Sequence, residues 1–236
     1  MLTKKNIENT IYLSLAAQFI TTIVSLDGVK YKLNDNDKIL QDILKLELFV
    51  QVVESVFYIW IIYSLKRFDT MTTRRYIDWA ITTPTMLIST IMFMKYQEHK
   101  ENNDNVSLEL YSFLNDNKDN IKKIVIYNGL MLLFGFLGET KKINKELSVG
   151  IGFIFFFLSF NIIYKEYANK SNEGKKLFNF LITVWSLYGI AALTDPITKN
   201  ISYNILDVIA KNFYGLFIYF KIKNQQASYQ DQSNEV

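Results

Sequence analysis

The chain has 236 residues, of which 50% are hydrophobic and 15% aromatic, and its formal net charge is +3. It has no cysteine, which excludes disulfide bonds and thiol chemistry, and its single histidine, His99, argues against a histidine-based metal site or catalytic triad. The small net charge gives no reason to expect nucleic-acid binding. We therefore expect no enzyme, no metal site and no nucleic-acid partner.

The apolar residues collect in seven stretches, each close to the length of about 20 residues that crosses the hydrocarbon core of a bilayer. These stretches are Ile7–Leu26, Ile39–Leu65, Tyr76–Met94, Ile121–Leu137, Leu147–Tyr164, Leu177–Leu193 and Ile201–Phe220. They predict an all-α integral membrane protein, a bundle of seven transmembrane helices formed by residues 1–224. The N-terminus lacks the pattern of a cleaved signal peptide, so we expect the first helix to be retained. Only Pro84 and Pro196 interrupt the chain, so most helices should run straight.

The loops and the tail are predicted separately. Lysine and arginine are more frequent in the loops that face inward if the N-terminus lies outside, which favours an outer N-terminus and an inner C-terminus. The long polar loop 97–120 contains Val106–Leu114, where a short interfacial helix is expected. Residues 225–236 are polar and are expected to form a disordered tail.

The second stretch carries two acids inside the membrane. Glu47 and Glu54 are seven residues apart and therefore share one face of the helix at two depths. Acids in such positions are costly and usually line a water-filled path. The alternative is that Glu54 is neutral and hydrogen-bonds a neighbouring helix.

The third stretch carries a further acid, Asp78. Thr82 lies one turn below it on the same face, and Ser89 lies on that face seven residues after Thr82. Arg75 precedes Asp78 by almost one turn, close to the outer interface. This face is therefore polar along much of its length.

The seventh stretch contains Lys211, with Asp207 one turn before it on the same face. An ammonium at the centre of a membrane helix costs about 2.5–3.5 kcal/mol even on insertion scales, so it must be paired, neutralised or chemically used. A structural ion pair between helices is one alternative. Trp185 and Tyr188 on the sixth stretch are compatible with ordinary packing, but beside a buried lysine they suggest a slot for a flat conjugated ligand held as a Schiff base.

Two motifs in combination closely resemble the microbial rhodopsins. They are Arg75-Tyr-Ile-Asp78-Trp-Ala-Ile-Thr-Thr-Pro84 and Asp207-Val-Ile-Ala-Lys211, and Asn128-Gly-Leu-Met131 on the fourth stretch also fits. The resemblance implies retinal bound as a protonated Schiff base on Lys211, with Asp78 and Asp207 as counter-ions, Arg75 close by and Asp78 as the first proton acceptor. It also implies a retinal pocket made of Trp79, Thr83, Met131, Gly135, Trp185 and Tyr188.

The chain departs from the proton pumps of this family at three places. Ser89 stands where many pumps have an inner carboxylate that returns a proton to the Schiff base. Lys199 aligns with the outer glutamate of bacteriorhodopsin, and Gly189 and Ala192 align with a proline and a second tryptophan. Reprotonation is therefore expected to be slow or to follow another route.

The second helix instead resembles that of the channelrhodopsins, whose central gate combines a serine, a glutamate and an asparagine. Ser14, Glu54 and Asn212 occupy the matching positions, and Asn204 adds a polar group in the outer half. Similar positions occur in viral rhodopsins that act as light-gated cation channels. We expect a light-gated cation channel for monovalent cations or protons; the alternatives are an outward proton pump and a sensory receptor. The family commonly forms trimers or pentamers, and the sequence does not choose among homo-oligomers.

Overall fold

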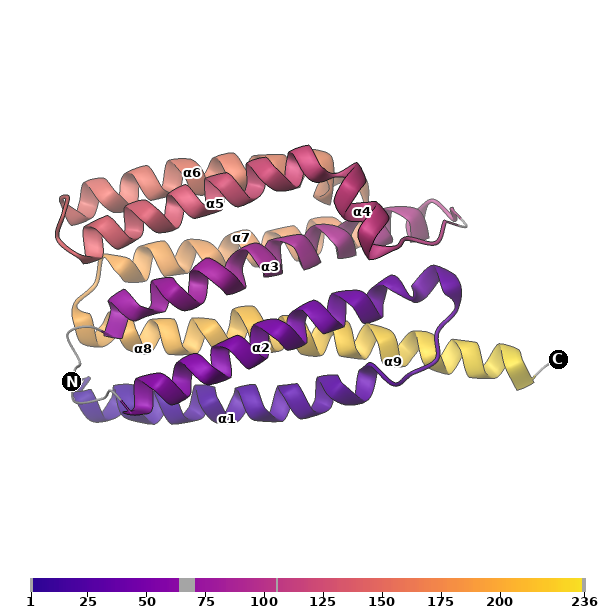
Figure 1. The fold of residues 1–236 in the computed structure, drawn as a ribbon, viewed down its shortest axis with the longest axis horizontal. Helices are drawn as coiled ribbons and strands as arrows, with labels where there is room; N and C mark the ends of the chain where they lie inside the picture. Colours follow the sequence, from indigo (N-terminus) through magenta and orange to yellow (C-terminus); the bar gives the residue numbers. More distant parts are fainter. Residues whose placement is uncertain (1, 64–70, 105, 235–236) are drawn as a thin grey trace.

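The computed structural model describes residues 2–63, 71–104 and 106–234, and within these ranges every regular element is a helix. The described residues form seven long helical rods, which lie lengthwise beside one another (Figure 1). Six of them are α1 Lys4–Gly28, α2 Ile39–Tyr63, α3 Met71–Glu101, α5 Lys118–Glu139, α6 Lys145–Glu166 and α7 Asn172–Ala192. The seventh rod is made of α8 Pro196–Asp207, the π-helical η4 Val208–Asn212 and α9 Phe213–Asn234. Shorter elements are η1 Asp35–Asp37, α4 Leu110–Asp116 and η3 Ala168–Lys170.

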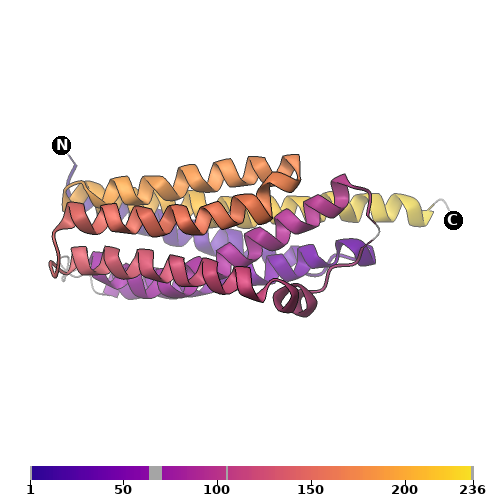
Figure 2. The ribbon, with the colours of Figure 1, turned by 90° about the horizontal axis from the view of Figure 1, so that it is seen from above.

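The predicted seven-helix bundle is confirmed. Each rod contacts the next in chain order, and α1 contacts both α2 and the seventh rod, so the helices form a closed ring. Viewed at a right angle to Figure 1, the rods still follow one common direction (Figure 2). The predicted end of the second stretch at Leu65 lies outside the described residues.

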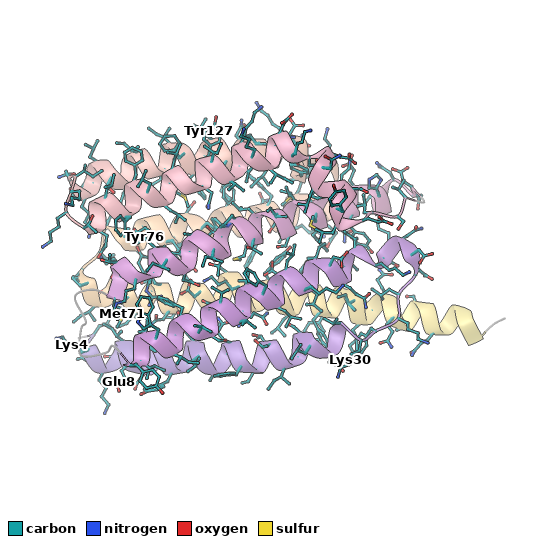
Figure 3. All side chains as sticks on the ribbon, in the orientation of Figure 1. Lys4, Glu8, Lys30, Met71, Tyr76 and Tyr127 are labelled. Carbon is teal, nitrogen blue, oxygen red and sulfur yellow. The ribbon has the colours of Figure 1, made fainter. Side chains whose placement is uncertain are left out.

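The surface of the bundle is apolar, as expected for an integral membrane protein. On α1, for example, the side chains of Leu13, Ile20 and Ile23 are 62%, 62% and 68% exposed. Five of the described helices are long and apolar enough to cross a bilayer. Figure 3 shows Lys4 and Glu8 at one end of the bundle and Lys30 at the other. The two termini also lie at opposite ends (Figure 1), which an odd number of spans requires.

Three local expectations were wrong. The helix expected at Val106–Leu114 is shifted to Leu110–Asp116. The loop expected from Gln97 begins later, because α3 continues to Glu101, supported by an ion pair between Lys95 and Glu98 at 2.9 Å. The tail expected to be disordered continues α9 as a helix to Asn234, because no proline or glycine stops a helix that has already been nucleated.

The seventh rod is also not a uniform α-helix. Its start is well defined, since Pro196 occupies the first turn and Asp195 accepts hydrogen bonds from the backbone N–H groups of Ile197 and Thr198. At Val208–Asn212 the backbone changes to π-helical hydrogen bonding. Such segments occur frequently at functional sites, and this one contains Lys211.

Candidate functional site

The centre of the bundle is occupied by one amine and three carboxylates. Lys211 is 2% exposed, and its Nζ donates a hydrogen bond of 2.8 Å to Asp78 Oδ2 on α3. The same Nζ lies 3.2 Å from Glu54 Oε1 on α2 and 3.7 Å from Asp207 Oδ1 on α8. Three helices therefore direct anionic groups at one buried cation, which keeps that cation inside an apolar bundle.

Asp207 is shared between Lys211 and a second cation. Its Oδ2 accepts hydrogen bonds from Arg75 Nη1 at 3.0 Å and from Tyr58 Oη at 2.8 Å, and its Oδ1 accepts one from Tyr188 Oη at 2.8 Å. The expected proximity of Arg75 to the carboxylates is thus present. Sequence reasoning missed Tyr58, although its position one turn after Glu54 on α2 was an available signal.

Asp78 is the acid nearest to Lys211. Within the described residues, Asp78 Oδ1 has no hydrogen-bond partner. Thr82 does not provide one, because its hydroxyl donates to the backbone oxygen of Asp78 at 3.0 Å. Asp78 Oδ1 is therefore available to water or to a proton.

A cavity of about 120 Å³ extends from Lys211 between α3, α5, α6 and α7. Its lining is almost entirely apolar, as is usual for small-molecule sites. All six residues predicted for the retinal pocket line it: Trp79, Thr83, Met131, Gly135, Trp185 and Tyr188.

Two glycines shape this cavity. A Cβ on Gly135 would lie 2.8 Å from Tyr76 Oη, and a Cβ on Gly189 would lie 2.5 Å from Phe153 Cζ. Figure 3 labels Tyr76 on α3, the helix beside α5. The absence of a side chain at Gly189 thus leaves room for the ring of Phe153. An apolar cavity that ends at a buried primary amine fits an elongated apolar aldehyde such as retinal.

The predicted gate is assembled differently from the expectation. Gln18 on α1 donates through Nε2 to both Glu54 Oε2 and Asn212 Oδ1, and Asn212 Nδ2 donates back to Gln18 Oε1 at 3.0 Å. Ser14 contacts neither of these two partners through a side-chain hydrogen bond and instead donates to the backbone oxygen of Asn204 at 2.9 Å. Gln18 is therefore the bridging residue that sequence reasoning missed.

The missed residue belongs to a polar face of the first helix. Four polar side chains on α1 are buried at intervals of four, three and four residues: Ser14, Gln18, Thr21 and Ser25. This spacing places them on one helical face, so the signal was present in the sequence. Thr21 also belongs to the network, because Asn212 Nδ2 donates to its hydroxyl at 2.6 Å.

Asn204 joins three helices in the half of the bundle nearer the N-terminus. Its Oδ1 accepts a hydrogen bond from Arg75 Nη2, and its Nδ2 donates to Thr10 Oγ1 at 2.8 Å. The amide thus joins α8 to α1 and α3. Beyond it, Lys199 pairs with Glu139 on α5, with Nζ 2.6 Å from Oε2.

Ser89 was expected to leave the inner half of the bundle without an acid, but the structure places an acid from another helix beside it. The hydroxyl of Ser89 on α3 donates to Glu47 Oε1 on α2, and both side chains are fully buried. The two residues are 42 positions apart on different helices, so periodicity within α3 could not reveal the pair.

Comparison with known proteins places these features in a family. The family model for bacteriorhodopsin-like proteins matches residues 8–225. The green-light absorbing proteorhodopsin of Gamma-proteobacterium EBAC31A08 is 24% identical over 174 residues, which cover 64% of this chain and 61% of that protein. The chain thus spans less than two thirds of that relative's length.

Solved structures share the fold over nearly the whole chain. The crystal structure of viral rhodopsin OLPVRII has a TM-score of 0.76 and 26% identity, covering 92% of this chain and 98% of the other. The blue light-absorbing proteorhodopsin from Med12 has a TM-score of 0.71 and 19% identity, covering 94% and 98% of the two chains. At that identity the second likeness supports the fold alone.

Proposed function

The chain belongs to the bacteriorhodopsin-like family, the microbial rhodopsins, and on that premise we propose that it is a light-gated cation channel with retinal attached to Lys211 as a protonated Schiff base. Retinal supplies the absorption of visible light and a light-driven change of shape beside this residue. Asp78, Glu54 and Asp207 lie 2.8, 3.2 and 3.7 Å from the nitrogen of Lys211 and would balance its positive charge.

The observation that carries the channel proposal is a set of buried polar side chains, which we call the polar seam. It runs between α1, α2 and the seventh rod, through three groups of side chains: Ser14, Gln18 and Thr21; Glu47, Gln51 and Glu54; Asn204, Asp207 and Asn212. Buried polar side chains along one membrane-spanning interface are costly unless they serve a path for ions or water. The acids in the seam would favour cations over anions.

Glu54 couples this seam to the site of light absorption. It contacts Lys211 on one side and accepts a hydrogen bond from Gln18 on the other. A displacement at Lys211 therefore changes the contact that holds Gln18 against Asn212. In this mechanism, release of Gln18 opens the path that its amide closes.

The test is voltage clamp of the expressed chain under light, with sodium, potassium and proton gradients varied separately. A passive channel gives photocurrents whose reversal potential follows the permeant cation. The Lys211→Ala variant is the matched control and should give no photocurrent. Photocurrents that keep one direction at every gradient would refute the channel.

The pairing of Ser89 with Glu47 favours a second candidate, an outward proton pump. In that mechanism Asp78, the acid closest to Lys211, accepts the proton, and Glu47 returns one from the inner side. The N-terminus would face outside in this orientation. Cells illuminated without any ion gradient decide between the two candidates: a sustained pH change that an uncoupler abolishes supports the pump, and its absence supports the channel.

A further inference from the structure

The cavity that begins at Lys211 has its other end against α5 and α6. Met131 and Gly135 on α5 and Gly152 on α6 line it together with Lys211 on the seventh rod. In Figure 1, α3 and α7 lie between α5 and the seventh rod. The cavity therefore crosses interhelical spacings of about 8–10 Å each, which suits an elongated ligand attached to Lys211. We call the part of the cavity at α5 and α6 its far end.

Tyr76 on α3 brings a hydroxyl group to the far end. Its side chain lines the cavity, and its Oη lies against α5, where a Cβ on Gly135 would be only 2.8 Å away. The ring of Tyr76 packs edge-on against Trp79 and Phe136, at centroid distances of 5.1 and 5.8 Å. No hydrogen bond to or from Tyr76 Oη occurs in the part of the chain that the structure describes. This phenol is thus held in place and can both donate and accept a hydrogen bond.

A second hydroxyl group at the far end belongs to Ser148 on α6. Its side chain lines the cavity and is 1% exposed, and its Oγ donates to the backbone oxygen of Phe134 at 2.6 Å. A serine hydroxyl has one hydrogen to donate and two lone pairs that accept. The donor of Ser148 is therefore used, whereas its oxygen can still accept a hydrogen bond from a ligand.

The two hydroxyl groups are neighbours along α5. Tyr76 Oη lies beside Gly135, and Ser148 Oγ lies beside Gly138, three residues further on the same helix. Residues three apart share a helical face, with Cβ positions about 5–6 Å from each other. An oxygen atom that makes two hydrogen bonds of about 2.8 Å spans about 5.5 Å. One hydroxyl group on a ligand can therefore accept from Tyr76 and donate to Ser148.

Retinal itself offers no partner to these hydroxyl groups. Its single oxygen leaves as water when Lys211 Nζ forms a double bond to the aldehyde carbon, and its ring contains only carbon and hydrogen. The phenol of Tyr76 would then remain unpaired beside an apolar ring, although tyrosine hydroxyl groups in such places usually have a hydrogen-bond partner. An oxygen atom on the ring would supply that partner.

We propose that the far end of the cavity is a subsite for an oxygen atom on the ring of the chromophore, and that the chain binds a ring-hydroxylated retinal in preference to retinal. Tyr76 is the specificity-determining residue, because its phenol donates to the ring oxygen, and Ser148 accepts the hydrogen of the ring hydroxyl. The inference rests on the attachment of the chromophore to Lys211 proposed above. It holds equally for a channel and for a pump.

Competition between two aldehydes tests the subsite. The full chain, expressed without retinal, is given equal amounts of all-trans-retinal and all-trans-3-hydroxyretinal. The bound aldehydes are then released with hydroxylamine and quantified by chromatography. We expect the hydroxylated aldehyde in about five- to tenfold excess, as one or two neutral hydrogen bonds allow. Equal amounts of the two aldehydes would overturn the proposal, and this measurement needs no variant.

Three variants locate the preference. Tyr76→Phe should bring the ratio of the two aldehydes close to one, and Ser148→Ala should lower it, while the pigment still forms. Tyr127→Phe is the matched control and should keep the wild-type ratio, because Tyr127 stacks on Phe155 at 6.3 Å and is not among the residues that line the cavity. Figure 3 labels both tyrosines. A preference that persists unchanged in Tyr76→Phe would refute the role of this residue.

The outcomes also separate the subsite from the proposed function. A coloured pigment with both aldehydes but no preference contradicts the subsite alone. A preference without any photocurrent contradicts the channel alone. A chain that stays colourless with both aldehydes contradicts the attachment to Lys211 and refutes the subsite with it.

Discussion

Replacing Gln18 by alanine should destabilise the protein and, if the chain is the channel that we propose, let ions pass in darkness. The side chain makes one hydrogen bond to the carboxylate of Glu54 and two to the amide of Asn212. A bond to a charged group is worth about 1.5–3 kcal/mol and a neutral one about 0.5–1.5 kcal/mol. The loss should therefore be about 3–5 kcal/mol, which corresponds to a fall in unfolding temperature of about 10 °C for a chain of this length.

The assay combines thermal unfolding, followed by circular dichroism, with voltage clamp in darkness. Without the bridging amide, Glu54 and Asn212 are no longer held together, and a leak current should appear before illumination. Thr22→Ala is the matched control, because the hydroxyl of Thr22 donates to the backbone oxygen of Gln18, at 2.7 Å, and to no other atom of the described residues. The control should stay within about 0.5 kcal/mol of the wild type and carry no dark current.

A Gln18→Ala variant with an unchanged unfolding temperature and no current in darkness would refute the role that we assign to Gln18. It would mean that the hydrogen bonds of Gln18 are replaced without cost by water. The closure of the seam would then have to lie elsewhere, for example at the contact of Arg75 with Asn204.

The remaining predictions concern the buried charges and the start of α8. Lys211→Ala should leave the purified protein colourless when retinal is supplied, as measured by visible absorption. Asp78→Asn should shift the absorption maximum to the red more than Glu54→Gln does, since Asp78 is the nearer acid, at 2.8 Å against 3.2 Å; an equal shift would contradict this order. Glu54→Gln should also change the photocurrent, because the same side chain accepts the hydrogen bond of Gln18. Hydrogen bonds from Thr198 hold the pKa of Asp195 below its usual value, so its capping of α8 is present at neutral pH and is lost as the pH falls through that lowered pKa. Asp195→Ala should therefore lower the unfolding temperature at neutral pH, and the difference from wild type should vanish in strong acid.

Local patterns and motifs in the sequence were sufficient to predict the helical bundle and many of the residues that line the pocket. Seven apolar stretches predicted seven rods, because the thickness of a bilayer sets the length of a spanning helix. The spacing of Asp207 and Lys211 predicted a buried acid beside a buried amine, since residues four apart share a helical face. Trp79, Trp185 and Tyr188 were expected in the pocket from the family resemblance, and all three line one cavity.

Only the tertiary structure decided which polar groups meet across helices. The sequence predicted Ser14, Glu54 and Asn212 as partners, but Gln18 stands between the last two, and Glu54 reaches Lys211 itself. Gln18 lies one turn after Ser14 on α1. Which of the two reaches Glu54 and Asn212 depends on how far α1 is shifted along its axis, and rotated about it, relative to its neighbours. The periodicity of a single helix does not determine either quantity. For the same reason the pairing of Ser89 with Glu47 could not be read from α3 alone. Periodicity within one helix determines which residues share a face, but the contact between two faces is determined by the packing of the whole bundle.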